Sequence, residues 1–261
     1  MLTLYDQNIT DISFQTLKEL LELVDFPICL CGGWAVYFTV NEYFKKQKDM
    51  NYIGSQDIDI GFSLQPMMSK SELELTNLFK MIHLLEQNDY VPSLLGYKKD
   101  IPFDEYSNHS QDEGKNQTFA IYVDIIVNSY PPSYQDIYQQ SFFEAPIIEK
   151  IYNYEQYHVK LPNISKYVFM PSREMIAAMK ILSLPSRGRQ HKKVKDLCDL
   201  YALIWFAEKS PENIIYEISQ LLKPASFKRL KAKINKKLIE ECEYLLNEPK
   251  GAIDTIMNQI F

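Results

Sequence analysis

The sequence Asp57-Ile58-Asp59-Ile60 alternates acidic and apolar residues. Because successive side chains of a strand point to opposite faces, this alternation predicts a strand with both aspartates on one face and both isoleucines in a core. Two carboxylates on one face repel each other unless a cation lies between them. Oxygen ligands at this spacing suit Mg²⁺, which takes one or two carboxylates and completes its shell with water and substrate phosphates. The alternative for an isolated Asp-x-Asp is a solvated strand edge.

A glycine pair, Gly32-Gly33, precedes the aspartates by a helix-length spacer. An apolar run, 26–30, comes before the pair, and residues 34–38 supply apolar side chains for a buried helix. Glycine at a strand-to-helix junction lets backbone N–H groups approach a phosphate, and the helix N-terminus favours an anion. A plain turn is the alternative for the pair alone. Together, in this order, the glycines and the aspartates favour a phosphate cradle followed by a metal site.

Composition places the chain among ordinary globular proteins. Its 261 residues suit one large or two modest domains, with 46% hydrophobic and 24% charged residues. The first residues do not resemble a signal peptide, and no apolar run is long enough to span a bilayer. The cysteines Cys29, Cys31, Cys198 and Cys242 form no CxxC pair and no zinc spacing. We therefore expect reduced thiols in a cytoplasmic protein without membrane association.

Charge divides the chain unevenly. Lys, Arg, Asp and Glu give residues 1–165 a charge of −12 and residues 166–261 a charge of +6, for the net −6. We expect one domain over 1–165, which contains the candidate metal site, and a helical bundle domain over 166–261. The basic half is a candidate surface for polyphosphate or RNA, whereas a chance excess of lysine on helix surfaces is the alternative. Six of the ten residues 228–237 are basic, which is typical of a solvated helix face or of a phosphate track.

Residue periodicity predicts an α+β fold. Apolar spacing, cap residues and β-branched runs predict the following elements: helices over 11–24, 33–46, about 70–87 and repeatedly from 172 onward, strands over 26–31, 58–62, 90–95 and 118–127, a loop over 98–116, and a hairpin of 147–152 with 157–161. The expected architecture is a mixed sheet flanked by helices and followed by a C-terminal helical bundle.

The strand over 118–127 contains a single acid, Asp124. Burial disfavours an ionised carboxylate that lacks a partner, so this position needs an explanation. A salt bridge or an edge position is one explanation. The other is a third carboxylate beside Asp57 and Asp59, which serves a second metal or acts as a general base.

Two features of the helical half bear on chemistry. Lys180 interrupts an apolar helix, so its side chain either extends to water or faces an anion. Asp196 and Asp199 share one face of the next helix, after a basic loop that includes Arg187 and Arg189. One interpretation is interhelical ion pairing. The other is that Lys180 and an arginine hold a triphosphate tail while Asp196 orients Lys180 or contacts a substrate.

These motifs resemble the polymerase-β-like nucleotidyltransferase superfamily. The glycine pair at a strand–helix turn, the Asp-x-Asp strand and the later strand aspartate carry this resemblance. The segment 171–180, the arginine loop and Lys195-Asp196-x-x-Asp199-Leu200 are similar to AbiEii-type nucleotidyltransferases, the toxin half of type IV toxin–antitoxin systems. The similarity covers about residues 26–205. The chain differs from the family pattern at Trp34, where a small residue is usual, and at Ile53, where arginine is common.

The resemblance implies a role for each matching residue. Gly32, Gly33 and Ser55 would contact nucleotide phosphates, and Lys180, Arg187 and Arg189 would contribute to nucleotide binding. Asp57, Asp59 and Asp124 would hold Mg²⁺ or Mn²⁺, and the catalytic set is Asp57, Asp59, Asp124, Lys180 and Asp196. The implied reaction moves an NMP from an NTP such as ATP, GTP or CTP to a hydroxyl of RNA or tRNA, a protein or a small molecule. A toxin or phage-defence role with an antitoxin partner is also implied.

Three functions remain open from the sequence. The first is this active nucleotidyltransferase. The second is a nucleotide-binding or partner-binding protein that keeps the fold without turnover, which Ile53 favours. The third is a glycosyltransferase, since Asp-x-Asp also holds metal-bound nucleotide sugars; the upstream glycines and the downstream Lys and Asp helices argue against it.

Overall fold

The computed structural model describes residues 7–102, 118–162, 164 and 166–261. Within them, the contacts divide the chain into two compact units. The sheet unit comprises Tyr5–Trp34 and Gly54–Met170. The helical unit comprises Ala35–Ile53 and Pro171–Phe261. The predicted boundary near residue 165 stays a prediction. The contact division differs from it in grouping residues 35–53 with the C-terminal helices.

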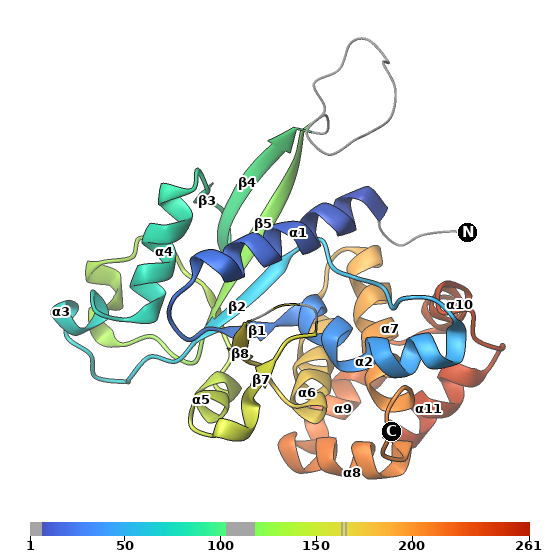
Figure 1. Ribbon diagram of the computed structural model, residues 1–261. Coiled ribbons are helices and arrows are strands. Elements are labelled where there is room, and N and C mark those ends of the chain that lie inside the picture. The colour runs from blue at the N-terminus through green and yellow to red at the C-terminus, as the bar shows by residue number, and fades with distance from the viewer. Residues whose placement is uncertain (1–6, 103–117, 163, 165) are drawn as a thin grey trace, which may run out of the picture. The chain divides into compact units, whose positions relative to one another are not determined.

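The sheet unit is built on one mixed sheet (Figure 1). Its eight described strands follow the order β3-β4-β5-β2-β1-β8-β7, with β6 paired to β5. They are β1 (Cys29–Cys31), β2 (Ile58–Phe62), β3 (Val91–Pro92), β4 (Gly96–Pro102), β5 (Thr118–Val127), β6 (Phe143–Glu144), β7 (His158–Lys160) and β8 (Tyr167–Phe169). Strand β2 lies at the centre, antiparallel to β1 and parallel to β5. The predicted strands 58–62 and 118–127 are both confirmed.

Helices cover this sheet. They are α1 (Gln7–Leu23), α3 (Lys70–Leu73), α4 (Asn77–Gln87) and α5 (Ile147–Tyr152), and α2 (Gly32–Lys48) starts in this unit. Figure 1 shows α1 lying over one face of the sheet. The side chains Leu17, Leu20 and Leu21 of α1 are buried, as its helical spacing predicts. The Trp34 indole N–H donates to the Ser13 hydroxyl at 3.1 Å, so the start of α2 is joined to α1.

Several predicted elements of the sheet unit were wrong in extent or type. The helix expected over about 70–87 is two helices, because Ser69 and Thr76 each cap a new N-terminus. The predicted strand 90–95 is reduced to Val91–Pro92. The loop expected from 98 begins as strand β4, whose polar residues pair with β5 from Gly96↔Asp124 to Pro102↔Thr118. The rest of that predicted loop, 103–117, lies outside the described residues.

The hairpin expected from 147–152 and 157–161 was also wrong. Residues 147–152 form α5, because Ile148 and Ile151 are buried at helical spacing after Pro146. Strand β7 pairs instead with β8, in the register His158↔Phe169 to Lys160↔Tyr167. The β-branched residues of this segment favoured a strand in sequence, but burial on one helical face decides its conformation.

The helical unit contains most of α2 and the C-terminal helices. These are α6 (Arg173–Ser183), α7 (Gln190–Trp205), α8 (Pro211–Leu221), α9 (Pro224–Lys231), α10 (Lys236–Leu245) and α11 (Ala252–Ile260). Ser172 caps α6 by accepting a hydrogen bond from the Met175 N–H. The half-buried Arg173 guanidinium donates to the carbonyls of Leu203 and Thr39, so it joins α6 to α7 and α2. The α+β class, with a mixed sheet, flanking helices and C-terminal helices, is confirmed.

Candidate active site

The glycine pair forms the junction between β1 and α2. Gly32 has φ of +61°, a left-handed conformation that side chains other than glycine rarely adopt. A Cβ atom built on Gly32 would lie 1.7 Å from Asp59 Oδ2. The Asp59 carboxylate therefore rests directly against the glycine backbone at the start of α2. No side chain fits between the helix N-terminus and this carboxylate.

The second glycine makes a similar contact with Ser55. A Cβ on Gly33 would lie 2.5 Å from the Ser55 hydroxyl oxygen and 2.7 Å from its Cβ. Ser55 is buried and lies just upstream of Asp57. The structure thus brings together four of the predicted site residues, Gly32, Gly33, Ser55 and Asp59, in one place.

Strand register adds Asp124 to this group. In the parallel pair of β2 with β5, Asp59 is the direct partner of Asp124. Both aspartates are half-buried, whereas their strand neighbours Ile58, Ile60 and Ile125 are buried. Asp57 comes immediately before β2, two positions from Asp59. The alternation predicted from sequence is therefore present, and the two strand acids lie side by side on adjacent strands.

This arrangement has the chemistry of a metal–phosphate site. Carboxylate oxygens are the ligands that Mg²⁺ prefers, and the N-terminus of α2 offers backbone N–H groups and a favourable dipole to an anion. Within the described ranges, no three His, Cys, Asp or Glu side chains are grouped so that they could hold a metal ion. Asp59 and Asp124 nevertheless fit Mg²⁺, which commonly takes one or two carboxylates and substrate oxygens.

A second group of predicted residues lies in the helical unit. The Lys180 ammonium of α6 lies 2.7 Å from Asp196 Oδ1 and 2.7 Å from Asp199 Oδ2, both on α7. Arg187 Nε donates to Asp196 Oδ2 at 2.6 Å. Lys195 donates to Asp199 Oδ1. These contacts join α6, the following loop and α7 through two carboxylates.

The pKa values of the two lysines of this network are shifted in opposite directions. Burial by itself lowers the pKa of Lys180, but Asp196 and Asp199 outweigh it and raise that pKa well above its usual value. Burial also lowers the pKa of Lys195, and Asp199 compensates only in part. Burial raises the pKa of Asp196, yet Lys180 and Arg187 overcome this and bring it to about 2. Lys180 and Asp196 are therefore a charged, buried pair.

Among the predicted nucleotide contacts, Arg187 and Arg189 are the accessible ones. Both are exposed, with 41% of the Arg187 side chain accessible despite its bond to Asp196. Lys180 and Asp196 are buried, so the interhelical ion pairing that the sequence left open is present. Lys180, Arg187 and Asp196 contact one another within the helical unit, whereas Gly32, Gly33, Ser55, Asp57, Asp59 and Asp124 belong to the sheet unit.

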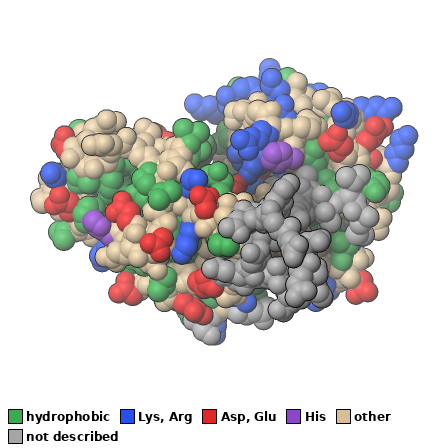
Figure 2. Space-filling model, turned by 90° about the horizontal axis from the view of Figure 1, so that it is seen from above, with side chains coloured by type: hydrophobic (Ala, Val, Ile, Leu, Met, Phe, Trp, Pro, Cys, Tyr) green, Lys and Arg blue, Asp and Glu red, His purple; other side chains and the backbone are tan. Residues whose placement is uncertain are grey.

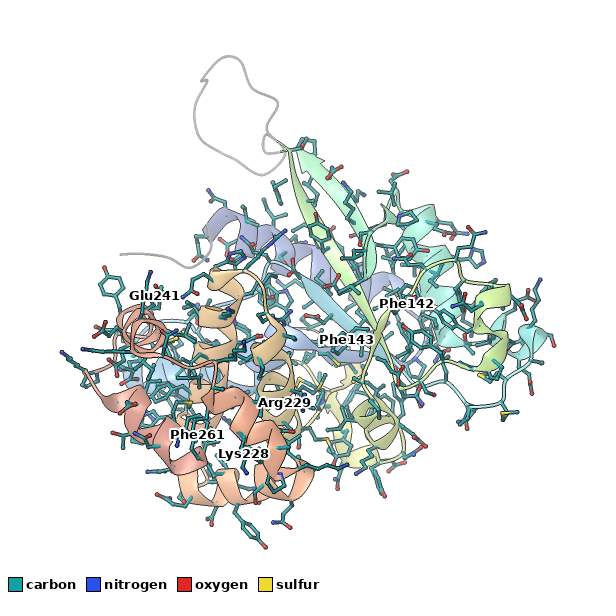
Figure 3. All side chains as sticks on the ribbon, turned by 180° about the vertical axis from the view of Figure 1, so that it is seen from behind. Phe142, Phe143, Lys228, Arg229, Glu241 and Phe261 are labelled. Atoms are coloured by element: carbon teal, nitrogen blue, oxygen red, sulfur yellow. The ribbon has the colours of Figure 1, made fainter. Side chains whose placement is uncertain are left out.

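The basic residues of 228–237 form an exposed track. Lys228 and Arg229 of α9, which Figure 3 labels, are exposed, as are Lys231, Lys233, Lys236 and Lys237. Lys236 and Lys237 lie 3.8 and 3.9 Å from Glu240 and Glu241 on α10. Figure 2 shows Lys and Arg side chains gathered in one part of the face that it displays.

Sequence reasoning missed Tyr52 and the central place of Asp199. Tyr52 is 2% exposed, and its hydroxyl donates to Asp199 Oδ1 at 2.8 Å. Asp199 is fully buried and also contacts Lys180 and Lys195. The i, i+3 spacing of Asp196 and Asp199 was the available signal for the network. Nothing in the sequence around Tyr52 indicates its contact with a residue so far along the chain.

Comparisons with known proteins give limited similarity. No family model and no curated protein matches the chain. A solved structure that matches is the crystal structure of an antigenic nucleotidyltransferase-like protein from Paracoccidioides brasiliensis, with 18% identity and a TM-score of 0.37. The match covers 93% of this chain and 98% of that one. At this identity and TM-score the similarity does not identify a function, so the proposals below depend on the residues of this chain.

One further finding concerns membranes. In the part of the chain that the structure describes, the helices are too short or too polar to cross a bilayer.

Proposed function

We propose that this chain is a Mg²⁺-dependent nucleotidyltransferase that moves an NMP from an NTP to an acceptor hydroxyl. The observation that carries the proposal is the contact of the glycine junction with the acids. Gly32 touches the Asp59 carboxylate, Gly33 touches Ser55, and Asp59 pairs in register with Asp124. A phosphate-binding helix start and a pair of metal-binding carboxylates are the two parts that phosphoryl chemistry needs in one place.

Each residue has a role in the proposed reaction. The backbone N–H groups at Gly32 and Gly33, with the Ser55 hydroxyl, bind phosphate oxygens. Asp57 and Asp59 would hold Mg²⁺, which would supply charge neutralisation at the triphosphate and polarisation of the α-phosphate. Asp124 accepts the proton of the acceptor hydroxyl as general base. The acceptor oxygen forms a bond to the α-phosphorus, the bond from that phosphorus to the bridging oxygen breaks, and pyrophosphate leaves with the electron pair.

The acceptor and the biological role are finer parts of the proposal. RNA is the favoured acceptor, because the exposed basic track of α9 and the following turn suits a phosphate backbone. The resemblance to AbiEii-type enzymes extends this to tRNA and to a toxin with an antitoxin partner. Contact of Lys180, Arg187 and Arg189 with the triphosphate stays a prediction.

Label transfer tests the proposal. Purified protein with Mg²⁺, each α-labelled NTP in turn and total cellular RNA should label RNA with one or more NTPs. The variant Asp57→Asn/Asp59→Asn should lose this transfer. Asp136→Asn, an exposed aspartate of the same unit, is the matched control and should keep it. Equal labelling by the double variant and the wild type would contradict the proposal.

A second function, nucleotide binding without turnover, is favoured by the pairing of Lys180. Its ammonium contacts two buried carboxylates, an arrangement that serves the helix packing rather than a substrate. This alternative predicts Mg²⁺-dependent NTP binding, measured by calorimetry, without label transfer to RNA, protein or small-molecule hydroxyls.

A further inference from the structure

The sheet face that carries Asp59 and Asp124 continues beyond β2. Side chains two positions apart in a strand share a face, so Tyr122 lies on the same face of β5 as Asp124. The register partner of Tyr122 on β4 is Lys98, whereas the partner of Asp124 is Gly96, which has no side chain. Tyr122 and Lys98 are therefore the next pair of side chains on β4 and β5 after the strand acids.

This part of the face is open, whereas the opposite face of β5 is not. Tyr122 is 39% exposed and Lys98 is partly exposed, but Ile121 and Val123 on the other face are buried in the core. Strand β5 continues past its first register pair with β2, Ile58↔Val123, and among the described strands it pairs there only with β4 (Figure 1). A large ring at a strand position that the core does not cover can contact a ligand.

Tyr122 and Lys98 together have the chemistry to bind a nucleotide. A tyrosine ring stacks on nucleobases of any sequence, and proteins bind single-stranded nucleic acids with such rings next to basic side chains that contact the backbone. Lys98 supplies the basic group. Its ammonium lies 3.3 Å from Asp100 Oδ2, but the pair is exposed to solvent and exposed ion pairs are weak, so a phosphate can compete with the aspartate.

The position of the pair in the sheet assigns it to the acceptor rather than to the NTP. Across the sheet the order is β1, β2, β5 and β4. The glycine junction, which would bind the NTP phosphates, follows β1, whereas Tyr122 and Lys98 lie on the other side of β2. In the proposed reaction Asp124 takes the proton of the acceptor hydroxyl. Tyr122 is two strand residues away from it, a separation of about 6.5 Å along the strand, so one nucleotide can contact both.

We propose that Tyr122 and Lys98 form the subsite of the acceptor nucleotide. The Tyr122 ring stacks on the base at the reacting end of a single-stranded RNA, the Lys98 ammonium contacts its phosphate, and its hydroxyl then lies against Asp124. This inference rests on the proposed function and adds to it the residues that select an RNA end as acceptor. All three side chains belong to the sheet unit.

Two variants remove the subsite side chains and two are matched controls. Tyr122→Ala removes the ring, and Tyr167→Ala removes another exposed tyrosine of the sheet, on β8, which lies beyond β1 on the other side of β2. Lys98→Ala removes the ammonium, and Lys99→Ala removes that of the next residue, on the opposite face, where it lies 5.6 Å from the centre of the Tyr90 ring. Melting temperatures establish that each variant is folded. Label transfer from the NTP is measured against the concentration of total cellular RNA and, separately, of the NTP.

Tyr122→Ala should raise the KM for RNA about 10-fold, the effect of losing one stacked base, and should leave the KM for the NTP within about 2-fold of the wild type. Tyr122→Phe keeps the ring and should raise the KM for RNA less. Lys98→Ala should lower the slope of log K for RNA binding against log salt by about 0.7, the effect of one phosphate contact. Tyr167→Ala and Lys99→Ala should match the wild type in each measurement.

An unchanged KM for RNA in folded Tyr122→Ala, where the wild type labels RNA, would overturn the subsite alone. So would a higher KM for the NTP without a higher KM for RNA, because the ring would then face the NTP. Equal salt slopes for Lys98→Ala and Lys99→Ala would overturn it as well, even where Tyr122→Ala does not fold. Wild-type protein that labels no RNA with any NTP would overturn the proposed transfer to RNA and this inference with it.

Discussion

At Gly32, the Asp59 carboxylate fills the space that any other side chain would need. The sequence allowed Gly32-Gly33 to be a plain turn, and the positive φ and the 1.7 Å approach explain why glycine is required at the first position. Residue-level prediction succeeded where a single local rule applies, as in the alternation of acids and isoleucines in β2. It failed at Tyr52, because a hydrogen bond to a residue distant in sequence leaves no local pattern.

Gly32→Ala should lower the free energy of unfolding by about 1–2 kcal/mol, the cost of a left-handed residue with a Cβ. It should also displace Asp59 and abolish Mg²⁺-dependent NTP binding. Urea unfolding and calorimetry measure the two effects. Gly251→Ala is the control, because Gly251 also has a positive φ, of +89°, but has no atom within 4 Å of a built Cβ. It should show the loss of stability and retain binding; retained binding by Gly32→Ala would contradict the account.

Asp196→Asn should destabilise the protein at neutral pH by about 3–5 kcal/mol, because Lys180 is left in a buried site with less compensating charge. The pKa of Asp196 is about 2, below its usual value of 3.8. Its charge therefore stabilises the fold fully above about pH 4, and this contribution is lost as the pH falls toward 2. Urea unfolding between pH 7 and pH 3 measures the difference from the wild type. A difference that does not shrink as the pH falls below 4 would contradict this assignment.

At the scale of the elements, tertiary pairing and burial on one face determined the type of several helices and strands that composition alone did not predict. The central strands were predictable because β-branched and apolar residues fill β5 and alternate in β2. The polar strand β4 could not be predicted from sequence, because it depends on pairing with β5. The helix α5 could not be predicted either, because it depends on the burial of Ile148 and Ile151 in the tertiary fold. The register of β2 with β5, which aligns Asp59 with Asp124, also depends on it.

The N-cap of α6 provides a prediction at this scale. Ser172→Ala should lower the free energy of unfolding by about 1 kcal/mol, because the Met175 N–H loses its acceptor. Ser172→Asp should restore most of this stability, since aspartate also caps helices. Urea unfolding of the three proteins is the measurement. Equal stability of the wild type and Ser172→Ala would show that the cap makes no net contribution.

Across the whole chain, the charge division bears on the proposed RNA acceptor. The −12 of residues 1–165 and the +6 of residues 166–261 favour binding of an anionic polymer by the C-terminal half. The α+β class was predictable from sequence. The glycines, the strand acids and the helical Lys and Asp could also be named from sequence as candidate site residues. The grouping of 35–53 with the C-terminal helices was not, because it depends on contacts between distant segments.

Replacing Lys228, Arg229, Lys231 and Lys233 with serine should weaken RNA binding and reduce its salt dependence. Each phosphate contact that is lost lowers the slope of log K against log salt by about 0.7 for a single strand. Four lost contacts would lower it by about 3. Binding to labelled RNA over a range of salt concentrations measures the slope. Nucleotide binding is the internal control and should not change; an unchanged slope would exclude this track as the RNA surface.

The central claim is that the glycine junction and the strand acids together form a metal–nucleotide site. Calorimetric titration of each NTP into wild-type protein and into Asp59→Asn/Asp124→Asn, with and without Mg²⁺, tests this claim most directly. The account predicts that the wild type binds an NTP only with Mg²⁺ and that the double variant loses this dependence while it stays folded. Binding that is equal with and without Mg²⁺, or equal in the wild type and the double variant, would contradict it.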